Sequence, residues 1–174
     1  MPSFKTHDNI TFLFSPLIFI GAWFITHNWI FTFLIFISFI FSGLMFSGDI
    51  DLKSKQYKRW GLLRWIWIPY QRLIPHRSSL SHGLIIGTIF RLSYLSLVII
   101  LFLLIVLGII NHLIHDNRIT SDILMNLNRV KDILFQNKYY LLAIFVGVCI
   151  GGISHTITDQ IYSLLKIIWK KIKD

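Results

Sequence analysis

The stretch NITFLFSPLIFIGAWFITHNWIFTFLIFISFIFSGLMFSG (residues 9–48) holds 40 consecutive residues without Asp, Glu, Lys or Arg. A helix needs about 20 apolar residues to cross the hydrocarbon core of a bilayer, so this stretch is long enough for two crossings. His27 and Asn28 interrupt it near its middle. We predict two membrane-spanning helices, over residues 10–26 and 29–47, joined by a tight turn. Such a hairpin returns the chain to the side of the membrane on which it began.

The rest of the chain has the same character. Hydrophobic residues make up 55% of the 174 residues, and the mean hydropathy is +0.66. No soluble core needs so much apolar surface, which indicates a bilayer as the solvent. Two further spans are predicted over residues 79–112 and 139–158. The expected fold is an all-α integral membrane helical bundle of about four transmembrane helices, with residues 1–174 as a single membrane domain.

Between the second and third spans, residues 48–77 contain seven Lys and Arg residues interleaved with Trp and Tyr. This mixture suits the headgroup layer, and Pro69 and Pro75 interrupt any long helix, so we predict an interfacial segment. Arg91, near the start of the third span, is expected to reach the headgroups. An amphipathic helix over about residues 120–136 and a basic tail over residues 160–174 complete the chain.

The distribution of basic residues predicts the orientation. With four spans, the N-terminus, residues 48–77 and the tail share one side and hold twelve of the 17 Lys and Arg residues, and the other side holds four. Basic residues concentrate on the cytoplasmic side, so both termini are expected there. The net charge of +9 lies beside apolar segments, which favours anionic lipid headgroups as partners and argues against nucleic acid.

In this topology the unusual polar side chains meet on one side of the membrane. They stand where the first and third spans begin and where the second and fourth spans end, and they are His7, Asp8, Asp49, Asp51, His76, Arg77, His82, His155 and Asp159. Four separate parts of the sequence therefore converge on one region. Imidazole and carboxylate groups bind zinc, or manganese and iron where carboxylates dominate. We predict a metal site at the cytoplasmic membrane surface, holding one or two ions, with Zn²⁺ preferred over Mn²⁺ or Fe²⁺.

Spacing supports particular roles. His155 and Asp159 are one helical turn apart and share a face, and Asp49 and Asp51 would point the same way on an extended backbone. Arg77 stands between His76 and His82, where its planar guanidinium suits a phosphate. The predicted metal ligands are His7, Asp51, His76, His82, His155 and Asp159, and the predicted catalytic residues are Asp8, Asp49 and Arg77.

Each motif alone also has an explanation without metal. The His155–Asp159 pair can be a hydrogen bond on a helix, Asp49 and Asp51 can belong to a helix end, and Asp8 can cap the first helix. A second cluster on the opposite side, His112, His115 and Asp116, is better explained as a polar helix end. Co-location of the first set favours metal binding.

The motifs resemble a family of metal-binding membrane proteins of unknown function found mainly in cyanobacteria. The matching stretches are Pro2–Ser3, Thr6–Asp8, Gly48–Asp51, Gln56–Gly61, Leu63–Trp67, Pro69–Tyr70, His76–Ser78, Leu80–Gly83, and Gly152 with His155 and Asp159. The resemblance covers nearly the whole chain. Its distribution would place the protein in a plasma or thylakoid membrane.

More distantly, the order of these residues is similar to YdjM-type membrane-bound metal-dependent hydrolases, a group thought to be related to the helical zinc phospholipase C and P1-type nuclease fold. That resemblance implies that His7, Asp51, His82, His155 and Asp159 are metal ligands or their direct neighbours. The chain departs from the zinc phospholipases because it has no Glu and too few His for three zinc ions.

Two functions follow as expectations. The first is a metal-dependent hydrolase at the cytoplasmic lipid interface, acting on a phosphoester such as a phospholipid or lipid phosphate, with Asp8 or Asp49 as general base. The alternative is a non-catalytic metal-binding membrane protein with a structural, assembly or regulatory role toward an unknown protein partner. An ion transporter is disfavoured, because transporter sites lie near the bilayer midplane and the spans carry almost no ionisable groups.

Overall fold

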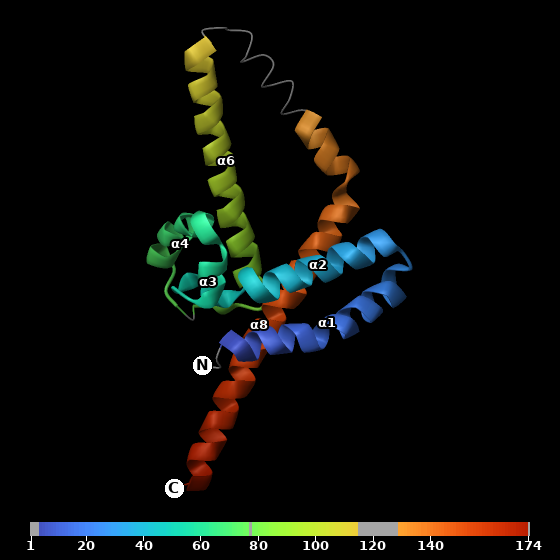
Figure 1. Cartoon of the computed structure of the whole chain (residues 1–174), viewed down its shortest axis with the longest axis vertical. Coiled ribbons are helices and arrows are strands. Elements are labelled where there is room, and N and C mark those ends of the chain that lie inside the picture. The colour runs from blue at the N-terminus through green and yellow to red at the C-terminus, as the bar shows by residue number, and fades with distance from the viewer. Residues whose placement is uncertain (1–3, 77, 115–128, 174) are drawn as a thin grey trace.

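The computed structural model describes residues 4–76, 78–114 and 129–173, and every regular element in these ranges is helical (Figure 1). The long helices are α1 (Phe4–Thr26), α2 (Trp29–Met45), α6 (Ile86–Ile114) and α8 (Lys138–Lys173). Between α2 and α6 lie the short helices η1 (Gly48–Asp51), α3 (Lys55–Arg59), η2 (Gly61–Trp67), α4 (Ile68–Leu73) and α5 (Ser79–His82). The predicted all-helical class is confirmed.

Helices α1, α6 and α8 are long and apolar enough to cross a membrane. Helix α2 is apolar but has only 17 residues, a length of about 25 Å against a hydrocarbon core of about 30 Å. The count of four spans therefore stays a prediction. Residues 129–136 are helical, while the rest of the predicted amphipathic helix lies outside the described residues.

The turn between α1 and α2 lies at His27 and Asn28. His27 adopts a positive φ of 47°, and the Asn28 side chain accepts hydrogen bonds from the backbone N–H groups of Ile30 and Phe31. This is an N-cap, which satisfies donors that the first turn of α2 cannot pair internally. Trp23 and Trp29 stack across the turn, with ring centroids 4.0 Å apart.

Small residues let α2 and α8 approach closely. A Cβ added to Gly147 would lie 2.4 Å from the Ile35 carbonyl oxygen, and one added to Gly151 would lie 2.6 Å from the Ser42 Cβ. The Ser42 hydroxyl donates to the Val148 carbonyl at 2.7 Å. Small residues and interhelical hydrogen bonds are what hold helices together in lipid, where apolar burial gives no driving force.

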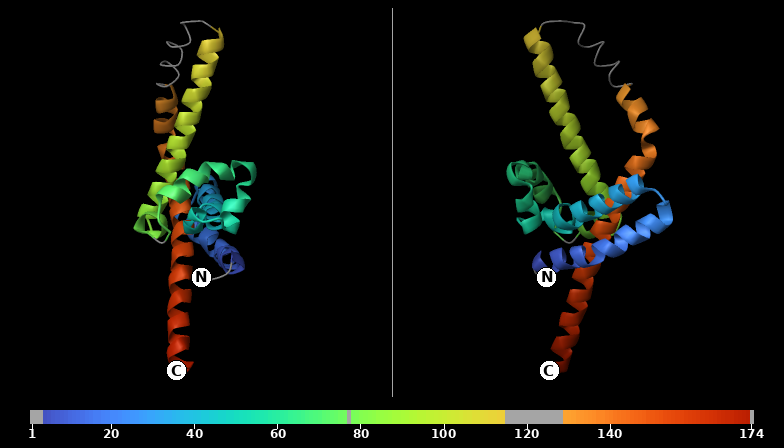
Figure 2. Two further views of the ribbon diagram at one scale, coloured as in Figure 1. Left: turned by 90° about the vertical axis from the view of Figure 1, so that its left-hand side faces the viewer. Right: turned by 45° about the vertical axis from the view of Figure 1, so that its right-hand side comes forward.

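The segment between α2 and α5 folds into a compact unit beside α6 (Figures 1 and 2). Its core is formed by Phe46, Ile50, Tyr57, Trp67, Tyr70 and Ile74, packed with Val148 of α8. Trp67 is fully buried, whereas Trp65 is 63% exposed. The predicted absence of a long helix is therefore found. However, only some of its aromatic residues are exposed. The others pack in the core of this segment, because successive short helices can surround one side of the chain.

Two details differ from the sequence-based expectations. The predicted third span is divided, since α5 ends at His82 and α6 begins at Ile86. Arg91 does not reach outward to headgroups: it is only 2% exposed, and its guanidinium donates to the Ser81 carbonyl at 2.6 Å and to the Thr88 hydroxyl at 3.1 Å. Buried carbonyl and hydroxyl acceptors replace water for this cation.

The predicted basic tail is also not a separate element, because α8 continues without interruption to Lys173. Helices α1 and α6 begin beside the middle of α8 and lead away from it, and α2 ends beside the same point (Figures 1 and 2). The start of α1, the end of α2, helix α5 and the middle of α8 therefore meet. This meeting point holds the predicted polar residues.

Candidate metal centre

Three elements supply a group of four potential metal ligands. Asp49 comes from η1, His82 ends α5, and His155 and Asp159 lie on one face of α8. One ligand atom from each residue lies within 4.8 Å of all the others. We call these four residues the primary group.

The distances in the primary group suit a shared cation better than direct hydrogen bonds. His155 Nε2 lies 3.6 Å from Asp49 Oδ1 and 3.4 Å from Asp159 Oδ2. His82 Nε2 lies 3.7 and 3.9 Å from the same two carboxylates. Hydrogen bonds to nitrogen donors are about 2.7–3.2 Å long. A tetrahedral zinc ion with bonds of ~2.1 Å holds its ligand atoms ~3.4 Å apart.

The hydrogen-bond inventory gives the same result. Among the described residues, His82 Nε2, His155 Nε2, Asp49 Oδ1 and Asp159 Oδ2 are buried atoms without a hydrogen-bond partner. Buried polar atoms in folded proteins are nearly always paired, because leaving them unpaired costs about 1–3 kcal/mol each. All four atoms belong to the primary group, so one cation at its centre would satisfy them together.

His7 adds a fifth side chain to this group. Its ring stacks on the His155 ring with centroids 4.0 Å apart, and its Nε2 lies 3.4 Å from Asp159 Oδ1. His7 is 5% exposed, and neither ring nitrogen has a hydrogen-bond partner in the described part of the chain. It can complete the coordination of an ion or exchange a proton beside it.

A second group shares His82 and contains Asp51 and His76; we call it the secondary group. Here His76 Nδ1 lies 2.9 and 3.0 Å from the two oxygens of Asp51, so the pair is already hydrogen-bonded. His82 Nδ1 lies 3.8 Å from Asp51 Oδ2 and 3.0 Å from the Ser81 hydroxyl. The two ring nitrogens of His82 therefore face different groups.

The local structure around His82 explains how so short a helix holds it. A four-residue helix has little stability of its own, and α5 is fixed through its carbonyl groups. Arg91 donates to the Ser81 carbonyl at 2.6 Å. The Thr156 hydroxyl is shared between the Gly152 carbonyl at 3.1 Å and the His82 carbonyl at 3.4 Å. A Cβ at Gly48 would lie 3.0 Å from the His82 ring, so glycine at that position leaves the space that the imidazole fills.

The electrostatics of the primary group favour an ionised carboxylate. Burial acts to raise the pKa of Asp49, but the neighbouring imidazoles of His155 and His82 outweigh it, and the pKa lies well below its usual range. Asp49 is therefore anionic at neutral pH, which suits a metal ligand and makes it a weak proton acceptor.

The six predicted metal ligands all lie in the two groups or, for His7, in contact with the primary group. Of the predicted catalytic residues, Asp49 stands among the ligand atoms. Asp8 is not in either group: its carboxylate accepts two hydrogen bonds from Arg59, at 2.8 and 2.5 Å, and this contact raises the pKa of Arg59. Arg77, and His115 and Asp116 of the other cluster, lie outside the described residues.

Sequence analysis missed Gln56, which is 5% exposed. Its Nε2 lies 3.4 Å from both His155 Nδ1 and the Gly43 carbonyl, while its Oε1 has no partner among the described residues. Metal binding by Nε2 of His155 needs the ring proton on Nδ1, and a side-chain oxygen must then accept it. A half-turn of the Gln56 amide would present Oε1 to Nδ1 as that acceptor, in exchange for the hydrogen bond that Nε2 donates to the Gly43 carbonyl. Nothing in the spacing of residues 99 apart could indicate this pair.

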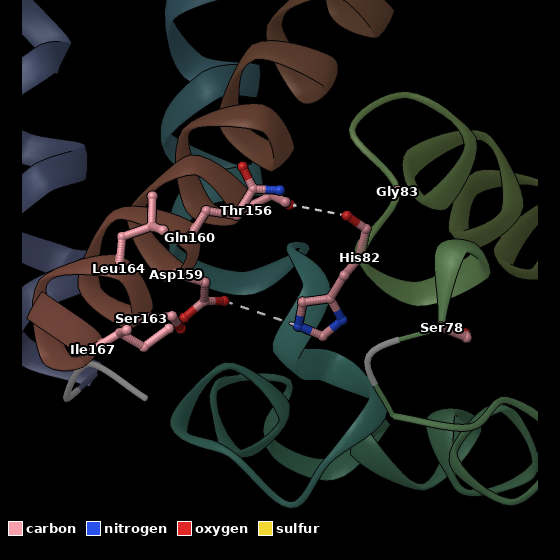
Figure 3. Close-up of a pocket in the computed structure, with 9 residues that line it drawn as sticks. All are labelled: Ser78, His82, Gly83, Thr156, Asp159, Gln160, Ser163, Leu164 and Ile167. Atoms are coloured by element: carbon pink, nitrogen blue, oxygen red, sulfur yellow. Dashed lines mark hydrogen bonds and ion pairs between the residues drawn. The ribbon is translucent and has the colours of Figure 1, made fainter. Parts of the chain in front are cut away.

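The primary group is open on one side. A pocket of ≈ 620 Å³ has His82 and Asp159 in its wall (Figure 3). Ser78 and Gly83, on either side of α5, belong to the same wall. The rest of it comes from α8, namely Thr156, Gln160, Ser163, Leu164 and Ile167. A small molecule in this pocket would therefore lie beside two of the four ligand residues.

Fold and site together define an all-helical metal-binding protein with helices suited to a membrane. The chain belongs to the family described as "uncharacterized metal-binding protein (DUF2227)", whose model matches residues 2–169. No curated protein and no solved structure matches it. The family match confirms the predicted metal-binding class and indicates no activity, so the similarity to YdjM-type hydrolases stays a prediction.

Proposed function

We propose that the protein is a metal-dependent hydrolase that cleaves a phosphoester at the membrane surface. One observation carries this proposal: of the four residues whose ligand atoms are unpaired, two, His82 and Asp159, line an open pocket. Catalytic zinc sites keep one position for water or substrate, so a catalytic ion here would be held by three of these side chains, or by all four in a five-coordinate arrangement, with its remaining position toward the pocket.

Asp49, His82, His155 and Asp159 would hold a divalent ion, which would supply Lewis acidity toward water and a phosphoryl oxygen when bound. The pocket hydroxyl groups of Ser78 and Ser163 can donate hydrogen bonds to the remaining phosphoryl oxygens. His7, with unpaired nitrogens beside Asp159, is better placed than Asp8 to accept a proton. Arg77 keeps its proposed role as a phosphate-binding residue.

Two imidazoles and two carboxylates form a donor set that favours Zn²⁺, with Mn²⁺ or Fe²⁺ as alternatives. The primary group is the proposed first site, and the secondary group would hold any second ion. The excess of basic residues supports a location of the site and both termini on the cytoplasmic side. It supports anionic lipids as neighbours as well.

A non-catalytic role is the alternative, and a different observation favours it. The ligands join α1, η1, α5 and α8, which are separate in sequence, and the His155 side chain is only 1% exposed. An ion bound among them would tie these elements together, so its binding would stabilise the fold. The protein would then contribute to assembly or regulation of a partner.

The test combines metal content with turnover. The purified protein is analysed by elemental mass spectrometry and assayed with bis(p-nitrophenyl) phosphate and with phospholipid vesicles, beside His82→Ala and, as a matched control, His27→Ala in the remote turn. We expect bound metal and metal-dependent hydrolysis in the wild type and the control, and neither in His82→Ala. Bound metal without any hydrolysis would overturn the enzymatic proposal in favour of the structural role, as would unchanged hydrolysis in His82→Ala.

A further inference from the structure

The C-terminal part of α8, residues 160–173, extends beyond the point where the other helices meet (Figures 1 and 2). We call it the α8 extension, and every one of its side chains is exposed. Helix α8 has 36 residues, a length of ~54 Å at 1.5 Å per residue. A hydrocarbon core of about 30 Å accounts for little more than half of that length.

The extension has one apolar side. Six of its large apolar residues recur three or four positions apart, and each is at least half exposed: Ile161 52%, Leu164 59%, Leu165 52%, Ile168 52%, Trp169 67% and Ile172 76%. Ile167, 56% exposed, lies outside this series. On a helix with 100° between residues, the side chains of the series form a continuous arc. Left in water, an apolar surface of this size would promote association, so something covers it.

The charges of the extension indicate which partner packs against the apolar arc. Lys166, Lys170 and Lys173 lie on the side opposite the arc and Lys171 at its edge, and residues 160–173 contain no acidic residue. A second copy of the extension would bring its four lysines close to the four lysines of the first, and the like charges would repel each other. An anionic bilayer surface instead offers phosphates to the lysines and acyl chains to the apolar arc, which is the pattern of an interfacial amphipathic helix.

We propose that the α8 extension binds the headgroup layer of an anionic membrane, with its apolar arc toward the acyl chains. Neither a metal ion nor hydrolysis is needed for this binding.

The extension also relates the membrane surface to the metal centre. Lys166 follows Asp159 by seven residues, which places it two turns further along the same face of α8, at ~10.5 Å along the axis. Leu164 and Ile167 belong to both the extension and the pocket beside Asp159. Anionic headgroups gathered by the lysines would therefore accumulate next to the pocket.

Spin labelling of the full chain tests the proposal. Single cysteines are placed along residues 160–173 in a Cys149→Ser background, labelled, and reconstituted in phosphatidylcholine vesicles with or without phosphatidylglycerol. Accessibility to oxygen, which partitions into lipid, is compared with accessibility to a water-soluble nickel chelate. We expect oxygen to dominate at Ile161, Ile168 and Ile172 and nickel at Ser163 and Lys170, with a contrast that grows in anionic vesicles.

Charge variants complete the experiment. Replacing all four lysines by Gln should remove the dependence on phosphatidylglycerol, at about fivefold in lipid affinity for each lysine, whereas the matched Lys→Arg variant should retain it. Equal nickel accessibility at all positions would overturn the proposal. So would a contrast that is the same in both lipid compositions. Dipolar broadening between labels at Ile168 on different molecules would overturn it in favour of a second copy as the cover.

Discussion

The two ligand groups that share His82 contain the same residue types but differ in whether their polar atoms have hydrogen-bond partners. In the secondary group His76 and Asp51 already form a hydrogen bond of 2.9 Å. In the primary group, nitrogen and oxygen atoms stand 3.4–3.9 Å apart and lack partners among the described residues. Ligand atoms on one tetrahedral ion are ~3.4 Å apart. Proximity of His and Asp is therefore not enough to indicate a metal site, whereas unpaired atoms at ligand spacing are.

The largest effect is expected from removing two ligands of the primary group. His155→Ala/Asp159→Ala should abolish metal binding there, because a site with two remaining protein ligands cannot compete with water and chelators. Elemental mass spectrometry of the purified protein should show about one equivalent in the wild type and none in the double variant. Full retention of metal in the variant would assign the ion to the secondary group and reverse the comparison.

The next effect concerns residues that orient the ligands without touching the ion. Gln56→Leu should weaken metal affinity by about 10- to 100-fold, the usual consequence of losing a partner of a ligating imidazole. Gln56→Glu, which keeps an acceptor for His155 Nδ1, should restore it. Competition titration with a zinc-selective dye measures both variants. Equal affinity for Leu and Glu at this position would show that the amide has no part in fixing the ring proton.

Arg91 and Thr156 should act in the same way through α5. Because they bind the carbonyls of Ser81 and His82, Arg91→Lys and Thr156→Val should each lower metal affinity by about tenfold. The absorption bands of bound Co²⁺ should shift as well, since His82 would no longer be held in place. Arg72→Lys, on an exposed part of α4, is the control. Unchanged Co²⁺ spectra in both variants would mean that α5 holds its position without them.

A much smaller effect is expected in the secondary group. His76→Gln leaves the primary group intact and replaces one hydrogen-bond donor to Asp51 by another. Metal affinity should therefore change by less than about threefold, and the free energy of unfolding by about 1 kcal/mol, the value of one hydrogen bond. Thermal unfolding and the dye titration measure the two quantities. A loss of one metal equivalent in this variant would show that the secondary group holds an ion of its own.

The sequence was sufficient for the features that depend on composition and periodicity. The 40 uncharged residues and the His27–Asn28 interruption predicted a helical hairpin, and the convergence of His7, Asp49, His82 and His155 followed from alternating the direction of the helices. It was insufficient for pairings that depend on side-chain direction. Asp8 and Asp49 looked equivalent as carboxylates next to helix ends, but Arg59 pairs with only the first of them.

The burial of polar residues was also not predicted from the sequence, because it too depends on side-chain direction. A single Arg in an apolar stretch is normally expected to reach toward water. Arg91 instead finds acceptors in Ser81, ten residues earlier and across a break in the helix, and in Thr88 one turn away. The break at Gly83–Ile85 makes the first contact available. Whether such a break occurs is decided by packing around His82, which no periodicity reports.

The smallest difference between the two ligand groups should be measurable in the stability of the protein at high pH, because the charge of Asp51 in the secondary group affects the pKa of Tyr70. Burial, and to a smaller extent the negative charge of Asp51, raise the pKa of Tyr70 to about 12, against the lowering effect of the nearby Arg91 guanidinium. A tyrosine with a raised pKa stabilises the fold fully below its unfolded value of about 10. That contribution is lost as the pH rises from about 10 to about 12, because the unfolded chain ionises first. Tyr70→Phe should therefore lose less stability over this interval, by about 2–3 kcal/mol.

Denaturant unfolding of both proteins between pH 9 and pH 12 measures this difference, with Tyr162→Phe, an exposed tyrosine of the α8 extension, as the control that should behave as the wild type. Repeating the measurement with Zn²⁺ shows whether the secondary group binds an ion. If the secondary group stays closed, the alkaline loss is the same with and without metal. If an ion binds Asp51, its charge is cancelled, ionised Tyr70 becomes easier to form, and the difference between wild type and Tyr70→Phe shrinks.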